Sequence, residues 1–311
     1  MHWLFNARQL RDCGILGMNR RNAEFVLDCN TRWAVGLADD KWRIHELCVS
    51  AGIATPKVHG AVRHLSELRQ LRERMAGLRE VVIKPARGSG GRGVLVLTGG
   101  TADGFRRSGG AECRWPEIAD HVADVLCGMH SLGAEPDIAL LQERVRLHPD
   151  FAPVATGGIP DLRIIVYRGV PAMAMLRLPT RTSGGRANLH QGGLGVGVDL
   201  TTGVTNHAVQ GGRSIRRHPD TGTMLLGRPV PRWHTALALS IQAAEAVKLG
   251  YLGVDIVVDA VHGPQLLEVN ARPGLAIQHA NSAGLAARLE AIDRGESPDC
   301  AGAPARALSV A

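Results

Sequence analysis

The stretch VVIKPARGSGGRGVLVL (81–97) contains a glycine-rich loop, GSGGRG (88–93), with a short apolar run on each side. The flanking runs VVIK and VLVL consist of β-branched and long aliphatic residues, which is typical of strands. A dinucleotide-binding loop would lead from a strand into a helix, and a P-loop would end in Gly-Lys-Ser or Gly-Lys-Thr. Neither condition is met, because a strand pattern follows and the loop ends in Arg92-Gly93-Val94. The sequence therefore predicts a strand, a flexible glycine loop and a second strand.

A hairpin loop of this kind can cover a triphosphate and donate backbone N–H groups to it, because glycine allows close approach of the backbone. Lys84 ends the first strand four residues before Gly88, within reach of phosphates under the loop. Lys41, at the start of an expected helix, is a second phosphate-binding candidate. Protein kinases use a similar loop, but this sequence lacks their His-Arg-Asp and Asp-Phe-Gly segments. The alternatives are a mobile hairpin tip for the loop and a solvated helix residue for Lys41.

Three oxygen-bearing side chains interrupt two apolar segments nearer the C-terminus. Glu268 and Asn270 are two residues apart in QLLEVN, so their side chains share one face of a strand. Asp255 interrupts GVDIVVD, and a turn at His262-Gly263 would bring it opposite that strand. A buried bare carboxylate is costly, so Asp255 must be paired or coordinated. The set suits Mg²⁺, completed by waters and phosphate oxygens. The alternative is that Asp255 and Glu268 form ion pairs with Arg272 or another arginine.

The composition is that of a globular protein with one large domain or two joined domains. The 311 residues are 45% hydrophobic and 21% charged, and the net charge is +7. Basic proteins bind nucleic acid, anionic membranes or anionic small molecules. No run of five basic residues occurs and no aromatic residues interleave with them. We therefore expect no nucleic-acid partner, and nucleotide phosphates explain the charge as well.

Cysteine spacing and the lack of long apolar runs bear on the compartment. The six cysteines show no Cys-x-x-Cys pair and do not cluster with histidine, so a zinc site is not expected. They fit a reducing compartment. No apolar run of about 18 residues occurs, and the N-terminus does not have a signal-peptide pattern. We expect a cytoplasmic protein without a membrane span.

Helical and strand patterns follow one another without strict βαβ alternation, which predicts an α+β fold rather than a doubly wound one. Apolar residues at helical spacing predict helices at 39–51, at 65–76, from 116 and at about 232–249. Short apolar runs predict further strands at 138–145, 162–169, 171–178, 253–259 and 265–270. The two middle strands form a hairpin around Arg168-Gly169. The glycine-rich stretches 99–114 and 181–197 are expected to be loops.

Together these segments resemble the ATP-grasp superfamily over roughly residues 36–285. VVIKPARGSGGRGV resembles its phosphate-covering loop, LLQERV its adenine-contacting strand, and GVDIVV and LLEVNARPG its metal-binding strands. The segments DLRIIVYRG (161–169), MLRLPT (175–180) and GRANLHQGG (185–193) resemble RimK-type α-L-glutamate ligases. The opening ILGMNRRNAEFVLDCN (15–30), followed by DDK, is similar to α-L-glutamate ligase-related, or sugar-transfer-associated, ATP-grasp proteins.

The resemblance implies an ATP-grasp fold, in which two α+β subdomains clamp ATP. The expected divisions are an N-terminal helical segment at 1–35, an ATP-grasp domain at 36–285 with a small lobe at about 55–140 and a large lobe at about 141–285, and a flexible tail at 286–311. ATP-grasp ligases usually carry a Rossmann-like domain before this region. Only about 35 residues precede Asp39-Asp40-Lys41 here, which leaves the usual substrate platform, and glutamate specificity with it, open.

The resemblance also implies roles for individual residues. The ATP phosphates would be contacted by Lys41, Lys84 and the loop residues Gly88, Ser89, Gly90, Gly91, Arg92 and Gly93. The adenine would be held by Gln142, Glu143 and Val145, with Glu143 accepting from its amino group. Magnesium, or Mn²⁺ in its place, would be bound by Asp255, Glu268 and Asn270. The γ-phosphate and the substrate carboxylate would be faced by Arg163, Arg177, Arg186 and Asn188. For Arg177, the alternative is a structural pair with an acidic residue.

The implied reaction is ATP- and Mg²⁺-dependent amide formation between a carboxylate and an amine. The carboxylate attacks the γ-phosphate to give an acylphosphate, and the amine then displaces phosphate, so positioning and cationic stabilisation suffice for catalysis. Glutamate or another amino acid would be joined to a peptide, protein or sugar-linked acceptor. The family is often oligomeric, so a homo-oligomer is compatible with the resemblance. The alternatives are an ATP-grasp kinase that phosphorylates a small molecule and a non-catalytic ATP-binding regulator.

Overall fold

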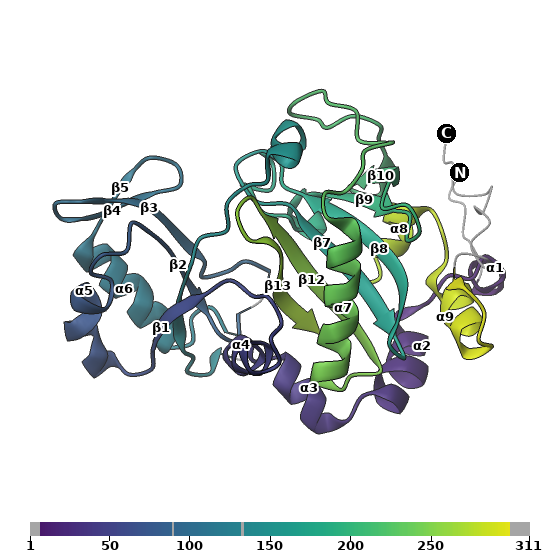
Figure 1. The fold of residues 1–311 in the computed structure, drawn as a ribbon, viewed down its shortest axis with the longest axis horizontal. Coiled ribbons are helices and arrows are strands. Elements are labelled where there is room, and N and C mark those ends of the chain that lie inside the picture. Colours follow the sequence, from purple (N-terminus) through teal and green to yellow (C-terminus); the bar gives the residue numbers. More distant parts are fainter. Residues whose placement is uncertain (1–6, 89, 132–133, 299–311) are drawn as a thin grey trace. The chain divides into compact units, whose positions relative to one another are not determined.

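The computed structural model describes residues 7–88, 90–131 and 134–298, and the chain divides into two compact units. Each unit contains one antiparallel sheet with helices packed against it (Figure 1). The smaller unit consists of Asp40–His45 and Thr55–Val145. The larger unit consists of Met1–Asp39, Glu46–Ala54 and Arg146–Ala311. The fold is therefore of the α+β class, as the sequence predicts.

The sheet of the smaller unit has the strand order β1-β6-β2-β3-β4-β5. Its strands are β1 (Val58–Val62), β2 (Glu80–Pro85), β3 (Leu95–Thr101), β4 (Gly104–Arg107), β5 (Glu112–Arg114) and β6 (Ala139–Gln142). One face is covered by η2 (Leu65–Gln70), α5 (Leu71–Arg74) and α6 (Trp115–Leu126). The apolar stripe of α6, with Ile118 and Val122 fully buried, packs against Val81, Ile83 and Leu97 of the sheet. These three helices do not cover the opposite face of the sheet.

The stretch 99–114, expected to be a loop, instead contains most of a small antiparallel meander. Strand β4 pairs with β3 on one side and with β5 on the other. Phe105 and Cys113 are buried between them and the helices, so two short strands supply core residues. Gly104 lies so close to the carbonyl of Cys113 that a Cβ atom would overlap it. The glycines therefore mark turns and a close strand approach rather than an unstructured segment.

The larger unit has a seven-stranded sheet with the order β11-β10-β9-β8-β7-β12-β13. Its strands are β7 (Asp161–Tyr167), β8 (Val170–Leu178), β9 (Leu194–Val198), β10 (Thr205–Gln210), β11 (Arg213–Ser214), β12 (Tyr251–Asp259) and β13 (Gly263–Asn270). The predicted hairpin around Arg168-Gly169 is confirmed, and so is the antiparallel pair β12–β13. The expected loop 181–197 ends earlier than predicted, because its last residues form β9.

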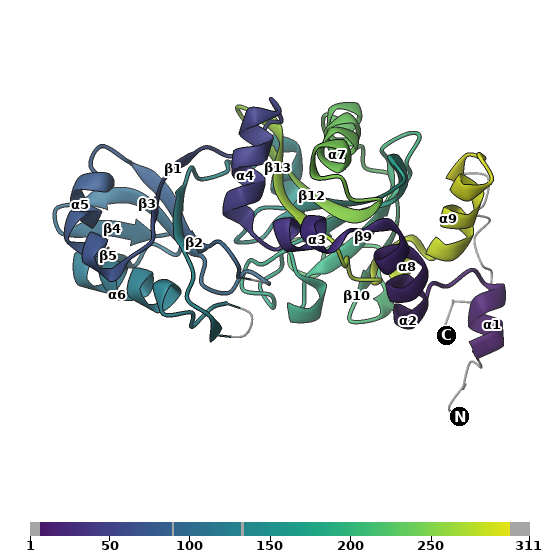
Figure 2. The same ribbon diagram turned by 90° about the horizontal axis from the view of Figure 1, so that it is seen from below.

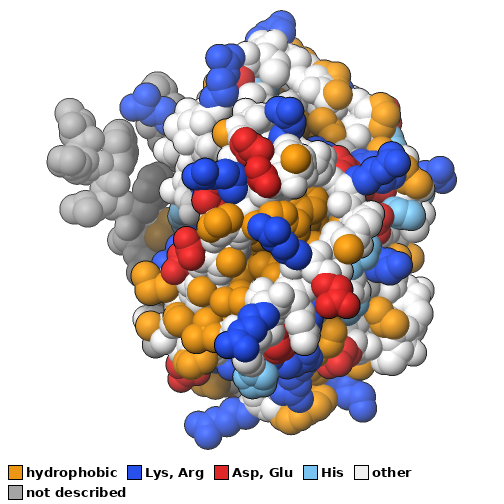
Figure 3. Space-filling model, turned by 90° about the vertical axis from the view of Figure 1, so that its left-hand side faces the viewer, with side chains coloured by type: hydrophobic (Ala, Val, Ile, Leu, Met, Phe, Trp, Pro, Cys, Tyr) orange, Lys and Arg blue, Asp and Glu red, His pale blue; other side chains and the backbone are white. Residues whose placement is uncertain are grey.

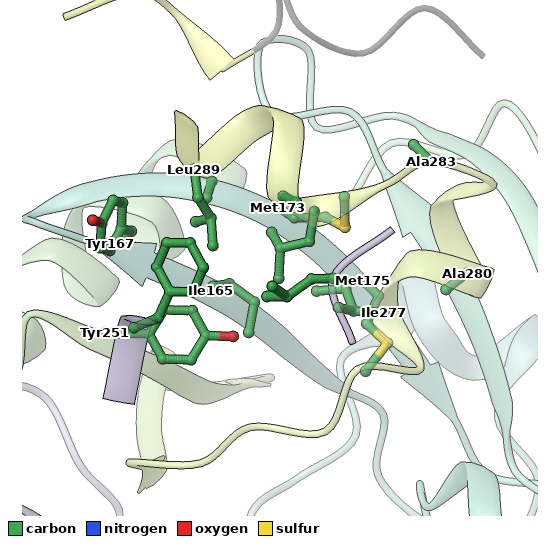
Figure 4. Packing of buried hydrophobic residues seen from close by; sticks show 14 of the residues in the cluster. Ile165, Tyr167, Met173, Met175, Tyr251, Ile277, Ala280, Ala283 and Leu289 are labelled. Carbon is green, nitrogen blue, oxygen red and sulfur yellow. The ribbon is translucent and has the colours of Figure 1, made fainter. Parts of the chain in front are cut away.

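Helices cover both faces of this sheet. Helix α7 (Trp233–Val247) lies on one side of the strands, and α8 (Ile277–Asn281) lies on the other (Figure 2). On the α8 side, α9 (Leu285–Asp293) and the N-terminal helix η1 (Arg21–Leu27) complete an apolar cluster. Ile165, Met173, Met175 and Tyr251 of the sheet point into this cluster (Figure 4). These helices leave the polar ends of the same strands outside the cluster.

Two buried amide side chains attach the N-terminal segment to the rest of the larger unit. Gln278 accepts from the backbone N–H of Leu16 at 2.8 Å and donates to the carbonyl of Leu16 at 3.1 Å. Asn30 donates to the carbonyl of Tyr251 at 2.7 Å and accepts from its N–H at 3.0 Å. Each amide thus satisfies both backbone groups of a distant residue, which fixes the segment within its own chain. The remaining N-terminal helices are α1 (Ala7–Asp12), α2 (Met18–Arg20), α3 (Arg32–Ala38) and α4 (Lys41–Ser50).

The C-terminal tail expected from residue 286 is wrong for its first part. Residues Leu285–Asp293 form α9, and Leu289 is fully buried against the sheet. Tyr167 donates its hydroxyl proton to Asp293 at 2.9 Å. The alanine-rich pattern of this stretch provides a narrow helix face that packs closely, which its composition alone does not reveal. Residues 299–311 of the expected tail lie outside the described residues.

On the side seen in Figure 3, the Lys and Arg side chains of the described residues are spread over the face among acidic and hydrophobic ones, and some of them adjoin one another. Within the same described part of the chain, none of the helices has the length and apolar character needed to cross a membrane.

Candidate active site

Polar side chains form a row on one face of the larger sheet. Asp255 is paired in register with Arg163 of β7 and with Glu268 of β13, and directly paired residues share a face. Asn270 lies two residues beyond Glu268 and therefore on the same face. Arg163 is also two residues from Ile165 on β7 and therefore shares its face, and the Ile165 side chain lies in the apolar cluster under α8 and α9. The row thus continues the apolar face beyond the helices that cover it, on the side opposite α7.

Asp255 lies at the centre of this row and is 3% exposed. Arg163 binds it with two parallel hydrogen bonds, Nε to Oδ1 at 2.7 Å and Nη2 to Oδ2 at 2.6 Å. Arg177 adds Nη2 to Oδ2 at 2.7 Å, and the Asn270 amide lies 3.4 Å from Oδ2. Burial raises the pKa of Asp255, but the two guanidinium groups outweigh it and hold the pKa below its ordinary value. Asp255 is therefore ionised at neutral pH.

A second carboxylate, Asp161, holds the other side of Arg177. The two residues are paired across β7 and β8, and Arg177 Nε donates to Asp161 Oδ1. Burial raises the pKa of Asp161 to about 6, with Arg177 opposing the shift and Asp255 adding to it. Burial lowers the pKa of Arg177, but the two carboxylates reverse this and raise it above its ordinary value. The alternative named for Arg177, a structural ion pair with an acidic residue, is therefore present.

Asp161 is a member of this cluster that the sequence analysis missed. With Arg163 it forms an Asp-x-Arg pattern at the start of β7, and strand periodicity puts both side chains on one face. That spacing was the available signal. Two arginines and two aspartates balance in charge, which is the condition for burying such groups in a sheet.

The three residues predicted to hold magnesium lie together on one face, and Asp255 also forms the ion pairs with arginine that were named as the alternative. Glu268 and Asn270 are half-buried neighbours of Asp255 on one face, and together they provide two carboxylates and an amide. Among the described residues, no group of three His, Cys, Asp or Glu side chains could hold a metal by itself. Mg²⁺ is commonly bound by one or two carboxylates, with waters and phosphates supplying the rest. The donor set therefore suits an ion that shares its coordination with a phosphate ligand.

In the smaller unit, the predicted strand–loop–strand arrangement is confirmed. Strands β2 and β3 pair antiparallel on either side of the glycine loop. Lys84 is 8% exposed at the end of β2 and is paired in register with Leu140 of β6. Lys41 donates from Nζ to the carbonyl of Gly88 at 2.6 Å, at the start of the loop. Ser89 lies outside the described residues, whereas Gly90, Gly91 and Arg92 are exposed.

The residues predicted to hold adenine lie at the end of β6 and just after it. Val82 is paired with Gln142, so Gln142 shares with Lys84 the sheet face opposite α6. Gln142 is 6% exposed and donates to the carbonyl of Pro56 at 3.3 Å. Glu143 and Val145 are half-buried, and the Glu143 N–H donates to the carbonyl of Lys57 at 2.7 Å. Lys84 and Gln142 are thus placed on one face of the smaller sheet, and the roles of Glu143 and Val145 remain predictions.

Arg186 and Asn188 lie in the loop between β8 and β9, away from the strand positions of the other candidates. Arg186 is exposed. The Asn188 side chain accepts from the N–H of His190 at 3.0 Å and caps the 3₁₀ turn η5 (Leu189–Gln191). Within the described residues, no hydrogen bond or ion pair joins either one to the Asp255 cluster. Their roles remain predictions.

One antiparallel sheet carries a glycine hairpin loop, and the other carries a row of polar side chains centred on Asp255. Together with the family match below, these features define an ATP-grasp protein. The chain belongs to the sugar-transfer associated ATP-grasp family, whose model matches residues 20–294. The family predicted from the sequence is thereby confirmed.

One curated relative comes from Thioalkalivibrio sulfidiphilus (strain HL-EbGR7) and is described as a probable alpha-L-glutamate ligase. It is 28% identical over 267 residues, which cover 85% of this chain and 66% of that protein. The chain thus spans slightly less than two thirds of the length of this relative.

Similar solved structures include D-alanyl-alanine synthetase A from Vibrio cholerae O1 biovar eltor, with 11% identity and a TM-score of 0.49 over 87% of this chain and 64% of that one. VanG D-Ala:D-Ser ligase from Enterococcus faecalis has 14% identity and a TM-score of 0.48 over 84% of this chain and 62% of that one. The ATP-grasp ligase PsnB complexed with a minimal precursor has 15% identity and a TM-score of 0.43 over 85% and 62%.

Proposed function

We propose that this protein is an ATP- and Mg²⁺-dependent carboxylate–amine ligase that forms an amide through an acylphosphate. The observation that carries the proposal is the row Arg163–Asp255–Glu268 with Asn270, on the sheet of a chain that belongs to an ATP-grasp family. It combines three oxygen-bearing side chains with the fixed guanidinium group of Arg163 on a single face. Such a row suits a reaction in which negative charge develops on phosphate oxygens.

Asp255, Glu268 and Asn270 would hold magnesium, which would neutralise the phosphate charge when bound. The same residues accept Mn²⁺ on grounds of ligand type. Asp255 is suited to this role because its arginine partners keep it ionised although it is buried. Lys41, Lys84 and the loop residues would bind the ATP phosphates, and Gln142, Glu143 and Val145 the adenine.

The arginines can act on a second ligand without leaving Asp255. Arg163 uses Nε and Nη2 for its carboxylate, and Arg177 uses Nε for Asp161 and Nη2 for Asp255. In both residues the Nη1 group lies outside these ion pairs, and a guanidinium has five N–H donors. We infer that Nη1 faces the γ-phosphate and the substrate carboxylate, with Arg186 and Asn188 as further candidates. A guanidinium held in this way stabilises the transition state without reorganising.

The chemistry then proceeds without a protein nucleophile. A substrate carboxylate attacks the γ-phosphorus and ADP leaves, which gives an acylphosphate. The amine attacks the acyl carbon, phosphate leaves with the C–O bonding electrons, and the amine loses a proton. We propose glutamate or another amino acid as one substrate and a peptide, protein or sugar-linked molecule as the other. The description of the relative from Thioalkalivibrio as a glutamate ligase supports the first choice.

The test is a product analysis with ATP, Mg²⁺ and pools of amino acids and amine acceptors. We expect ADP, phosphate and an amide in equal amounts, measured by phosphorus NMR and mass spectrometry. AMP and pyrophosphate would overturn the mechanism. A stable phosphorylated product formed without amine would indicate a kinase, and ATP binding without turnover a regulator. Glu268→Gln should abolish turnover, whereas the same change at the exposed Glu112 should leave it intact.

A further inference from the structure

Two histidines of the smaller unit hold the end of the glycine loop. His121, on α6, lies with Nε2 3.1 Å from the carbonyl oxygen of Gly93. His130 packs its ring on the Cα of Gly93, where a Cβ atom would lie 2.6 Å from its Cγ. Gly93 also has a φ of +70°, a conformation that favours glycine. The last residue of the loop is therefore fixed by contact with α6 and the segment that follows it.

The first residue of the loop is fixed in a different way. Gly88 forms an isolated β-bridge with Ser131, and its carbonyl accepts from Lys41 Nζ. Ser131 donates from Oγ to Asp137 at 2.7 Å, and Asp137 also accepts from the N–H of Arg87 at 2.9 Å. This end of the loop has several independent contacts, whereas the carbonyl at the other end is held by His121.

The hydrogen bond to Gly93 defines the proton on His121. A carbonyl oxygen is only an acceptor, so Nε2 must be the protonated nitrogen. Burial lowers the pKa of His121, the Gly93 carbonyl raises it in part, and nearby His130 lowers it further. Asp124 favours the charged form and Arg107 opposes it. At neutral pH the ring is a neutral donor. The adjacent His130 ring lies 5.6 Å away between centroids, and its Nε2 is buried with no hydrogen-bond partner among the described residues.

We propose that His121 is a positioning residue for nucleotide binding, because its Nε2–H bond to Gly93 fixes the last residue of the glycine loop. This inference rests on the proposed function, in which the loop contacts the ATP phosphates. A loop whose end is already fixed loses less conformational entropy when its ligand binds. His121 itself does not touch the ligand and acts through Gly93.

The matched pair His121→Gln and His121→Asn isolates this bond. The Gln amide nitrogen occupies nearly the position of Nε2 and can donate to Gly93, whereas the shorter Asn amide cannot reach it. Loss of one hydrogen bond predicts an increase of about 5- to 10-fold in the Kd for Mg·TNP-ATP and in the KM for ATP. We expect this increase for H121N and recovery to within about twofold for H121Q. The kcat at saturating ATP and the Tm should change little in either variant.

Hydrogen exchange of peptides covering 86–97 provides a second readout, which does not require turnover. Exchange should be faster in H121N than in wild type and near wild type in H121Q. The control His234→Asn, at an exposed position of α7, should change neither affinity nor exchange. Equal affinity for H121N and H121Q, with wild-type exchange in both, would overturn the role of His121 while leaving the proposed function intact. Failure of wild-type protein to bind Mg·TNP-ATP would instead overturn the proposed function.

Discussion

Replacing Arg177 with methionine removes the guanidinium that lies between Asp161 and Asp255 and keeps an unbranched side chain of about the length of the arginine stem. Asp255 keeps both hydrogen bonds from Arg163. Asp161, 8% exposed, loses its ion-pair partner while the charge of Asp255 remains nearby. The substitution therefore leaves one buried carboxylate without a counter-charge. Breaking a buried ion pair from one side destabilises a protein by about 3–5 kcal/mol.

Protonation of Asp161 limits this loss. The pKa of Asp161 in the wild-type fold is about 6, so protonating the carboxyl group in place at pH 7 requires only about 1–2 kcal/mol, and at pH 5 the group is already mostly protonated. We therefore expect R177M to lose about 2 kcal/mol in the free energy of unfolding at pH 7, through this protonation and the loss of one hydrogen bond to Asp255, and about 1 kcal/mol at pH 5.

The assay is urea denaturation at both pH values, followed by circular dichroism, for wild type, R177M and R177M/D161N. The double variant no longer has the buried carboxylate and should regain the part of the loss at pH 7 that comes from protonation. A loss below about 1 kcal/mol at pH 7 would show that Asp161 is not desolvated as the structure indicates. A loss of equal size at pH 5 and pH 7 would refute the protonation argument.

Three further predictions concern stability away from the arginine cluster. Tyr251→Phe should be neutral or stabilising in thermal melts, because the Tyr251 hydroxyl is buried without a hydrogen-bond partner among the described residues. As the comparison, Tyr167→Phe should cost about 1 kcal/mol, because it loses the hydrogen bond to Asp293. Asn30→Ala should cost about 2–4 kcal/mol and speed hydrogen exchange of the N-terminal helices, because it orphans two buried backbone groups. Asp259 accepts from three backbone N–H groups; burial raises its pKa, but these bonds lower it overall. A carboxylate with a depressed pKa stabilises the folded protein at pH values above its unfolded pKa, and this stabilisation is lost as the pH falls through its folded pKa. Asp259→Asn should therefore be about 1–2 kcal/mol less stable than wild type at pH 7 and nearly equal to it near pH 2.

Each of these predictions has an outcome that contradicts it. A clear loss of Tm in Y251F would mean that its hydroxyl has a partner, such as a buried water. Unchanged exchange in N30A would mean that the N-terminal helices are held mainly by Phe25 and Val26. A stability gap between D259N and wild type that is the same at pH 7 and pH 2 would exclude ionisation of Asp259 as its source.

The features predicted correctly from the sequence depend on short-range periodicity. Strand alternation was enough to put Glu268 and Asn270 on one face, and the turn before Gly263 set Asp255 opposite them. The strand patterns on both sides of the glycine loop were equally local. In each case the residues that decide the structure lie within about 15 positions of one another, where turn and strand geometry limits the arrangement.

The features that were missed depend on pairing between distant segments. Asp161 became significant only when β7 was found between β8 and β12, because this order brings its strand to both Arg177 and Asp255. Gln278 and Asn30 bind backbone groups, which have no sequence signature. The short strands β4 and β5 were hidden by glycines that serve their turns. The contact of His121 with Gly93 joins a helix to a loop and has no local pattern at all.

The central claim is that a substrate carboxylate is activated by phosphorylation on this protein. The most direct measurement uses the acid substrate found in the product screen, labelled with ¹⁸O in its carboxylate, together with ATP, Mg²⁺ and the amine. Mass spectrometry of the released phosphate should show one ¹⁸O atom per molecule, because the acylphosphate oxygen comes from the carboxylate and leaves with phosphorus. Unlabelled phosphate, with both ¹⁸O atoms kept in the acid or its product, would contradict the account.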